Sequence, residues 1–155
     1  MDATFATSCS PTGAAELRQA LERAGWRFTR QRAEVFAYLR SVACHPTAEQ
    51  VFAGVRRHIP NISLATVYKA LEALVDAGLA ARLADERGGS ARYDGRAEPH
   101  YHVRCVRTGQ VRDLAVPYDP ELLTRLAPQL IERLRGEGFE ITGHRLEVVG
   151  HYREG

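Results

Sequence analysis

The chain has 155 residues, a length that fits one domain or two small ones. Apolar residues make up 45% and charged residues 26%, a balance typical of globular proteins that excludes an intrinsically disordered chain. The sequence has neither an apolar run near the roughly 20 residues of a membrane helix nor the basic-then-apolar start of a secretory signal.

Charge is distributed unevenly, although the formal net charge is only +2. From Arg23 to Leu71, eight basic residues stand against Glu34 and Glu49, a net charge of +6, whereas residues 96–155 contain nine residues of each sign. A basic first half favours an electrostatic footprint for nucleic acid. An arginine-rich solvated surface is the alternative, and charge alone does not separate the two.

The first half of the sequence predicts four helices after a flexible tail at residues 1–13. The first helix covers residues 14–24 and ends at Gly25. Thr29 caps a second helix, which His45-Pro46 ends.

Capping residues also mark the third and fourth helices. The capping box Thr47-Ala-Glu-Gln starts the third helix. Ser63 caps the fourth, which Gly78 closes and whose apolar stripe is Leu64, Val67, Leu71, Leu74 and Val75.

Two short strand-like runs follow, at residues 79–85 and 90–94, separated by Glu-Arg-Gly-Gly. Helices followed directly by a hairpin predict a winged helix-turn-helix domain over residues 14–94. The residues expected to face away from the apolar stripe, with Tyr68 at the border, are Ala65, Thr66, Lys69 and Ala73. Small and polar residues on this face favour contact with a DNA groove; a solvated structural helix is the alternative.

The second half predicts a small α/β dimerisation domain over residues 100–155, joined by a linker at residues 95–99. Its expected elements are strand 101–106, turn 108–109, strand 110–115, helix 120–135, strand 139–141 and strand 145–149. About 55 residues bury little core alone, so we expect a homodimer that spaces two winged helices for a palindromic operator in double-stranded DNA. The fold class is therefore α+β.

A hairpin predicts a cluster of metal-binding side chains in this second half. His100 and His102 alternate on one strand and share a face. A two-residue turn at Thr108-Gly109 pairs Arg104 with Asp113, which places Asp113 diagonal to His102.

Two further candidate ligands come from the first half: Asp94 at the end of the second strand and His45 at the break between the second and third helices. The five nitrogen and oxygen donors suit Fe(II), Mn(II) or Zn(II). Surface or internally hydrogen-bonded histidines are the alternative.

Seven strings, in order over residues 17–151, resemble the ferric uptake regulator (Fur) family, most of all its peroxide-sensing PerR branch. They are AGWRFTRQR, HPTAEQVF, PNISLATVYKALEALVDAGL, RYDG, HYHVRC, GQVRDL and GHRLEVVGH. The resemblance implies a dimeric, DNA-binding repressor that is not an enzyme. It implies a regulatory metal, Fe(II) or Mn(II) with Zn(II) as an occupant of purified protein, held by His45, Asp94, His100, His102 and Asp113. The three widely spaced cysteines, without a CxxC pair, predict a reducing, cytoplasmic compartment.

The resemblance also implies how signal and DNA are read. Peroxide reacting at Fe(II) oxidises His45 or His100 to 2-oxo-histidine, and DNA is released. The implied DNA-binding residues are Arg27, Arg30, Ser63, Thr66, Tyr68 and Lys69.

Three other readings stay open at this point. The first is a Fur-family sensor of iron, manganese or zinc without peroxide chemistry. A metallohydrolase built on His100 and His102 lacks a spare carboxylate at motif spacing. A thiol switch at Cys105 lacks a partner cysteine nearby, because Cys9 and Cys44 are distant in sequence.

Two departures from the family pattern affect metal sites. Relatives commonly hold a structural zinc with two CxxC pairs, but Thr108 stands where the partner of Cys105 would be, and Tyr152 and Gly155 replace the second pair. No four-cysteine structural zinc can form, so we expect side-chain packing to supply that stability. Tyr101 stands where an acid of another family site would be, which leaves His144 without its metal-binding partners.

Overall fold

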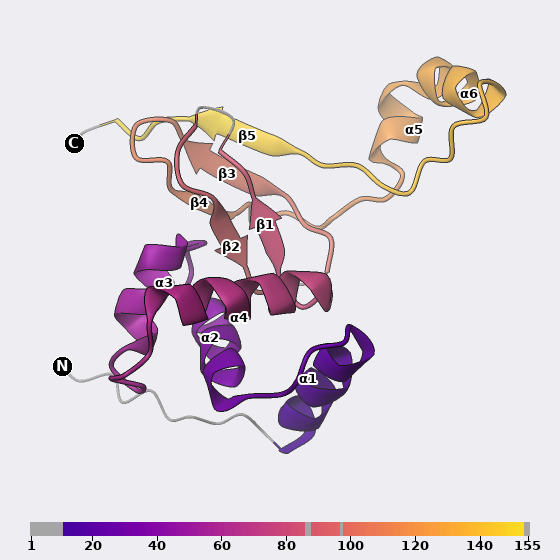
Figure 1. The fold of residues 1–155 in the computed structure, drawn as a ribbon. Coiled ribbons are helices and arrows are strands. Elements are labelled where there is room, and N and C mark those ends of the chain that lie inside the picture. The colour runs from indigo at the N-terminus through magenta and orange to yellow at the C-terminus, as the bar shows by residue number, and fades with distance from the viewer. Residues whose placement is uncertain (1–10, 86–87, 97, 154–155) are drawn as a thin grey trace. The chain divides into compact units, whose positions relative to one another are not determined.

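The computed structural model describes residues 11–85, 88–96 and 98–153. The chain divides into two compact units, residues 1–97 and 98–155, and each is described by itself. Helices and small sheets occur together, which confirms the predicted α+β class (Figure 1). Within the described residues, every helix is too short or too polar to cross a bilayer. The domain limits at residues 94 and 100 and the linker role of residues 95–99 stay predictions.

The first unit begins with four helices: α1 (Pro11–Arg23), α2 (Arg30–Ser41), α3 (Ala48–Val55) and α4 (Leu64–Asp76). The three predicted caps are confirmed: Thr29 and Ser63 accept backbone N–H groups of their helices, and Thr47 forms a capping box with Gln50. Helix α1 starts earlier than predicted, at a proline, which suits a first helical position. Residues 11–13 are therefore helical; the rest of the predicted tail, residues 1–10, lies outside the described residues.

The core of the first unit lies where the apolar faces of the four helices meet. Its largest fully buried side chains are Leu17, Leu21, Val35, Val51, Val55, Val67, Leu71 and Leu74. Ala73 is also fully buried, so the prediction that it faces outward was wrong. Helix α4 contacts both α2 and α3, which buries a wider face than one apolar stripe.

A two-stranded antiparallel hairpin follows α4 (Figure 1). Strands β1 (Ala81–Leu83) and β2 (Arg92–Asp94) pair with Ala81 opposite Asp94. The predicted turn includes residues 86–87, which lie outside the described residues. The backbone of β2 is also tied to the α2–α3 connection, because the Tyr93 N–H donates to the Pro46 carbonyl at 2.9 Å.

The second unit contains a three-stranded sheet of β3 (His102–Cys105), β4 (Val111–Asp113) and β5 (Glu147–Gly150). The strand order is β4-β3-β5; β4 is antiparallel and β5 is parallel to β3 (Figure 1). Between β4 and β5 come two helices, α5 (Leu122–Leu126) and α6 (Pro128–Gly136).

The turn between β3 and β4 is longer than predicted. The Cys105 N–H donates to the Gln110 carbonyl at 2.9 Å, so the loop is residues 106–109 and not Thr108-Gly109 alone. His102 is therefore opposite Asp113, and Arg104 pairs with Val111 instead of Asp113. A register shift of two residues keeps every side chain on its predicted face, because strand side chains alternate with period two.

Two further predictions for the second unit were wrong. The single helix predicted over residues 120–135 is interrupted at Pro128, which lacks an N–H and clashes with the preceding turn of a helix, so α6 starts there. Residues 139–141, predicted as a strand, do not form one. Their local alternation lacks the neighbouring strand that a ladder requires.

Candidate metal centre and predicted DNA-binding residues

His45 and Asp94 lie together in the first unit, and we call them the first-unit pair. His45 Nδ1 is 3.7 Å from Asp94 Oδ1, and the two residues are 4% and 1% exposed. The pairing of β2 with the α2–α3 connection positions them, through a bridge from Thr47 to Arg92. The Arg92 guanidinium also donates to the His45 carbonyl at 3.0 Å. The contacts between β2 and the α2–α3 connection therefore fix the backbone positions of His45 and Asp94.

Close packing of Gly95 holds the end of β2 against α2. A Cβ atom at position 95 would lie 2.8 Å from Leu39 Cβ and 3.1 Å from the Leu39 carbonyl carbon. The next residue also acts on the site, because the Arg96 N–H donates to Asp94 Oδ1 at 2.9 Å. Glycine at 95 therefore permits the backbone path on which the position of Asp94 depends.

His100, His102 and Asp113 form a second cluster, which we call the second-unit triad. His100 Nε2 lies 3.2 Å from Asp113 Oδ1, and the rings of His100 and His102 are 4.6 Å apart. One donor atom from each of the three residues lies within 4.8 Å of the others. The pairing of His102 with Asp113 across β3 and β4 produces this arrangement.

A hydrogen bond determines which nitrogen of His100 faces the triad. His100 Nδ1 is 2.6 Å from the Glu98 carbonyl oxygen, which can only accept a hydrogen bond. His100 therefore donates from Nδ1 to this carbonyl, and its Nε2 faces Asp113. Metal-binding histidines are commonly oriented by such a bond from the other ring nitrogen.

Donor type and spacing in both clusters fit a first-row divalent metal. Two donors that bind one ion at about 2.0–2.2 Å lie about 3–4 Å apart, and the distances of 3.7 Å and 3.2 Å fall in this range. The donors are imidazole nitrogens and carboxylate oxygens, a set that suits iron, manganese or zinc.

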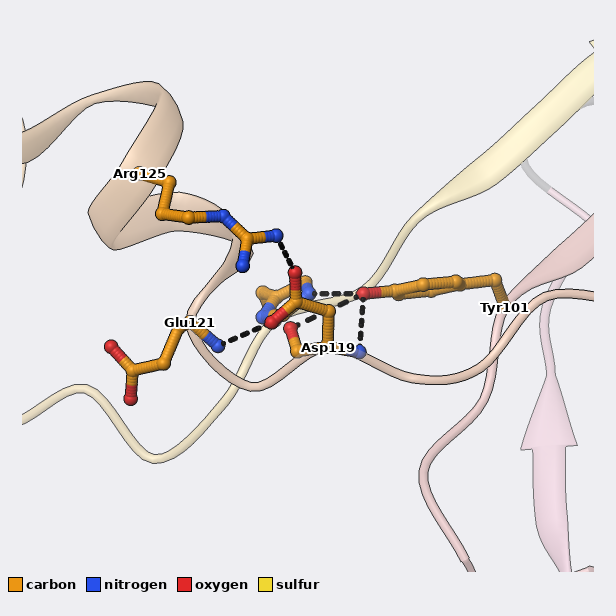
Figure 2. A network of polar contacts seen from close by, with 5 residues as sticks. Tyr101, Asp119, Glu121 and Arg125 are labelled. Carbon is orange, nitrogen blue, oxygen red and sulfur yellow. Dashed lines mark hydrogen bonds and ion pairs between the residues drawn. The ribbon is translucent and has the colours of Figure 1, made fainter.

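His144 has partners that the sequence did not reveal. Its Nε2 lies 3.0 Å from the Tyr101 hydroxyl and its Nδ1 lies 3.4 Å from the Tyr118 hydroxyl, with the Tyr118 and His144 rings stacked at 4.9 Å. Figure 2 shows the Tyr101 hydroxyl against the backbone of Asp119, whose carboxylate binds Arg125. Where the family pattern has an acid, this chain has a tyrosine-histidine network of hydrogen bonds.

The position of the missing structural zinc also has its own contacts. Cys105 is buried, and hydrogen bonds from the Thr108 side chain and then from the Thr108 backbone lower the pKa of its thiol. The Arg112 guanidinium lies over the Tyr152 ring, 5.1 Å from its centroid, and donates to its hydroxyl. Gly155 lies outside the described residues.

The predicted DNA-binding residues all belong to the first unit. Arg27 and Arg30 are exposed, as are Ser63, Tyr68 and Lys69, whereas Thr66 is half-buried. Ser63 has a structural role as the cap of α4, because its hydroxyl accepts the Thr66 N–H at 3.1 Å.

Glu49 lies beside these residues and was not predicted as part of the site. The Tyr68 hydroxyl donates to Glu49 Oε1 at 2.8 Å, a bond between α4 and α3. A backbone hydrogen bond at Glu49 and then this bond lower the pKa of Glu49, and the same bond raises the pKa of Tyr68. The available signal was that Glu49 is one of two acids in the segment of net charge +6.

Comparison with known proteins identifies the family. Residues 23–149 match the model of the Ferric uptake regulator family. The chain is 34% identical over 134 residues to the peroxide-responsive repressor PerR of Staphylococcus aureus (strain USA300), covering 86% of this chain and 85% of that protein.

Solved structures agree with this match. A ferric uptake regulator from Pseudomonas aeruginosa with manganese is 28% identical, with a TM-score of 0.65, covering 89% of this chain and 98% of that one. A zinc-bound manganese uptake regulator is 32% identical, with a TM-score of 0.60, covering 88% and 98%. The chain therefore belongs to the ferric uptake regulator family.

Proposed function

We propose that the chain is a metal-dependent, homodimeric, DNA-binding transcriptional repressor that responds to hydrogen peroxide. The observation that carries this proposal is the distribution of the donors. The first-unit pair and the second-unit triad each present imidazole and carboxylate groups at metal-binding spacing, one set in each unit. A single ion that binds both sets joins the two units.

Metal binding and DNA binding are coupled in this proposal through residues 95–99, which join the units. When His45 and Asp94 share an ion with the triad, the two units take one arrangement, and the affinity for operator DNA is high. When a histidine is lost as a ligand, that arrangement loses its stabilisation and DNA is released.

The reaction with peroxide takes place on a histidine ring. Bound Fe(II) would lend hydrogen peroxide one electron to activate it and would regain that electron from the ring, whereas Mn(II) would not react. At His45 or His100, one oxygen atom of hydrogen peroxide enters an imidazole C–H bond and the other leaves as water. The ring is oxidised by two electrons to 2-oxo-histidine and becomes a poor ligand. The protein is consumed and does not turn over, so we propose a sensor and not an enzyme.

Contact with DNA is assigned to the first unit. The α4 residues Thr66, Tyr68 and Lys69 face the groove, Arg27 and Arg30 contact phosphates, and the β1–β2 hairpin serves as the wing. The net charge of +6 between residues 23 and 71 supports this assignment.

Exposed apolar side chains of the second unit support a homodimer. Val148 and Val149 of β5 are 47% and 55% exposed, and Leu126 and Phe139 are also exposed. Apolar groups gathered on one small unit favour burial against a second copy. We expect sedimentation velocity to report a dimer, and Val148→Asp to shift it to monomer at the same concentration.

A metal-level sensor is the second candidate function. The 32% identity to a manganese uptake regulator favours it, whereas the 34% identity to a peroxide-responsive repressor favours the first. Both functions use the same five ligands, and a cytoplasmic location is part of both.

The decisive experiment compares two metals on the same protein. Protein loaded anaerobically with Fe(II) or Mn(II) is bound to DNA fragments that it selects from a random pool, then treated with hydrogen peroxide. We expect release of DNA only with Fe(II), together with a mass gain of one oxygen atom in peptides that contain His45 or His100. His58→Ala, which changes a histidine outside the five ligands, serves as the control and should respond normally.

Different outcomes separate the candidates. Metal-dependent DNA binding that survives peroxide, with unmodified histidine peptides, assigns the metal-level sensor. Failure to select DNA with either metal overturns both functions.

A further inference from the structure

The hydroxyl of Tyr68 is already engaged in the protein without DNA. Tyr68 is 45% exposed on the outward side of α4, yet its hydroxyl donates to Glu49 Oε1 at 2.8 Å. The polar tip of the side chain therefore points toward α3.

The place of Glu49 in α3 is set by the start of the helix. It lies in the first turn, two residues after the cap Thr47. A backbone hydrogen bond at Glu49 itself, then the Tyr68 hydroxyl and the Thr47 side chain, lower the pKa of its carboxyl group, so it is ionised at neutral pH. A carboxylate is favoured at this end of a helix by the helix dipole. The capped first turn of α3 thus provides Glu49 as the partner toward which the Tyr68 hydroxyl is held.

The charge of Glu49 opposes DNA binding when taken alone. It is one of two acids among ten charged residues between residues 23 and 71. A carboxylate beside the predicted groove-facing helix weakens attraction to phosphates at any DNA sequence. A favourable effect of Glu49 must therefore appear in how well the protein discriminates between DNA sequences, and not in its overall affinity for DNA.

We propose that Glu49 is a positioning residue for sequence recognition, which binds the Tyr68 hydroxyl and presents the Tyr68 ring to the DNA groove. Tyr68 then reads an apolar base edge through its ring, as apolar side chains contact the thymine methyl group, and not through its hydroxyl. This inference rests on the proposed function, because it takes α4 as the helix that reads DNA.

Preorganisation gives the expected size of the effect. A ring that is free in the unbound protein must be ordered on binding, which weakens specific binding by about three- to tenfold for one side chain. Non-specific binding, which depends on phosphates, does not require that ordering. The measured quantity is therefore the specificity ratio, the affinity for selected DNA divided by that for unrelated DNA.

Four variants of the full-length, Mn(II)-loaded protein test the proposal. Glu49→Ala removes charge and acceptor, Glu49→Gln removes the charge but keeps an acceptor for the Tyr68 hydroxyl, and Tyr68→Phe removes the donor but keeps the ring. Glu34→Ala is the matched control, because it removes the other acid of the basic segment.

We expect Glu49→Ala and Tyr68→Phe each to lower the specificity ratio by about three- to tenfold, and the double variant to lower it no further. Glu49→Gln and Glu34→Ala should keep the ratio within about twofold while binding all DNA more tightly at low salt. Unchanged urea midpoints show that the variants are folded, and a merely structural role would change the midpoint and not the ratio.

Three results would overturn the inference. In the first, Glu49→Ala keeps the wild-type ratio. In the second, Tyr68→Phe alone loses specificity, which means that the hydroxyl itself reads a base. In the third, Glu49→Gln matches Glu49→Ala, which means that only charge matters. If the wild-type protein selects no DNA, the proposed function fails instead.

Discussion

At His100, one hydrogen bond decides which ring nitrogen is available to an ion. His100 Nδ1 donates to the Glu98 carbonyl oxygen 2.6 Å away, so Nε2 faces Asp113. The backbone at the start of the second unit thus orients His100 as a proposed metal ligand. The bond links the backbone at residue 98, where the second unit begins, to the chemistry of the proposed site.

Thr108 should control the ionisation of Cys105. Its hydroxyl is the largest contribution that lowers the pKa of this thiol, because it stabilises the thiolate. Thr108→Val, which keeps the branched shape but removes the hydroxyl, should raise the pKa of Cys105 toward its ordinary value. Thiolate absorbance against pH, in a Cys9→Ser/Cys44→Ser background, measures this shift.

The sign of the effect on stability follows from the same bond. A thiol with a lowered folded pKa adds stability above its unfolded pKa, and that stability is lost as pH falls through the folded pKa. Thr108→Val should reduce this gain at alkaline pH. A titration midpoint that stays in place or moves to lower pH would contradict the assignment to Thr108.

Sequence patterns located single residues well where the partner is near in the chain. The caps Thr29, Thr47 and Ser63 are each three residues from the N–H group they bind, so local spacing was sufficient. The contacts of His144 join it to Tyr118 and Tyr101, 26 and 43 residues away, and no local pattern predicts such distances.

At the level of elements, the face of each strand was predictable but the length of the turn was not. Strand side chains alternate with a period of two, so His102 and Asp113 lie on one face even when the pairing shifts by two residues. The loop at residues 106–109 is set by a bond between the Cys105 N–H and the Gln110 carbonyl, which the Thr-Gly signal did not reveal. Pro128 was a visible break signal, and the apolar pattern that runs across it led to a helix that was too long.

The contact between β2 and α2 predicts the effect of a single methyl group. Gly95→Ala places a Cβ atom 2.8 Å from Leu39 Cβ and against the α2 backbone, so the chain at residues 94–96 must move. We expect about 1–3 kcal/mol of destabilisation, the usual range for overpacking, and weaker metal binding because Asp94 shifts. Urea unfolding and Mn(II) titration measure the two effects.

Gly136→Ala is the matched control for this change. It adds the same methyl group at the end of α6, where an added Cβ meets nothing within 4 Å. Its stability should stay level or rise slightly, because alanine is the better helix residue, and its metal affinity should be unchanged. Equal effects of the two substitutions would contradict a packing role for Gly95.

At the scale of the whole molecule, the proposed metal ligands come from two compact units, whereas the ligands of an ordinary buried metal site belong to one. Each unit is compact and has its own set of donors, and residues 95–99 lie between Asp94 and His100 in sequence. The five proposed ligands were predicted from spacing and from a family resemblance. How strongly metal couples the units depends on the relative stabilities of two arrangements, and no sequence pattern encodes that difference.

Proteolysis at Arg96 should report this coupling directly. The Arg96–Ala97 bond is a trypsin site within the predicted linker. A metal ion bound to residues on both sides of the linker restricts the conformations of the linker, so fewer of them fit the protease. We expect Mn(II) to slow cleavage after Arg96 by at least tenfold, with the rate followed by mass spectrometry of the two fragments.

Asp113→Ala retains both units and the trypsin site but removes one proposed ligand, so it should be cleaved at the same rate with and without Mn(II). Cleavage after Arg153, outside the segment between the ligands, serves as the internal reference. If Mn(II) protects wild-type protein and Asp113→Ala equally, the ion acts elsewhere than at the five proposed ligands.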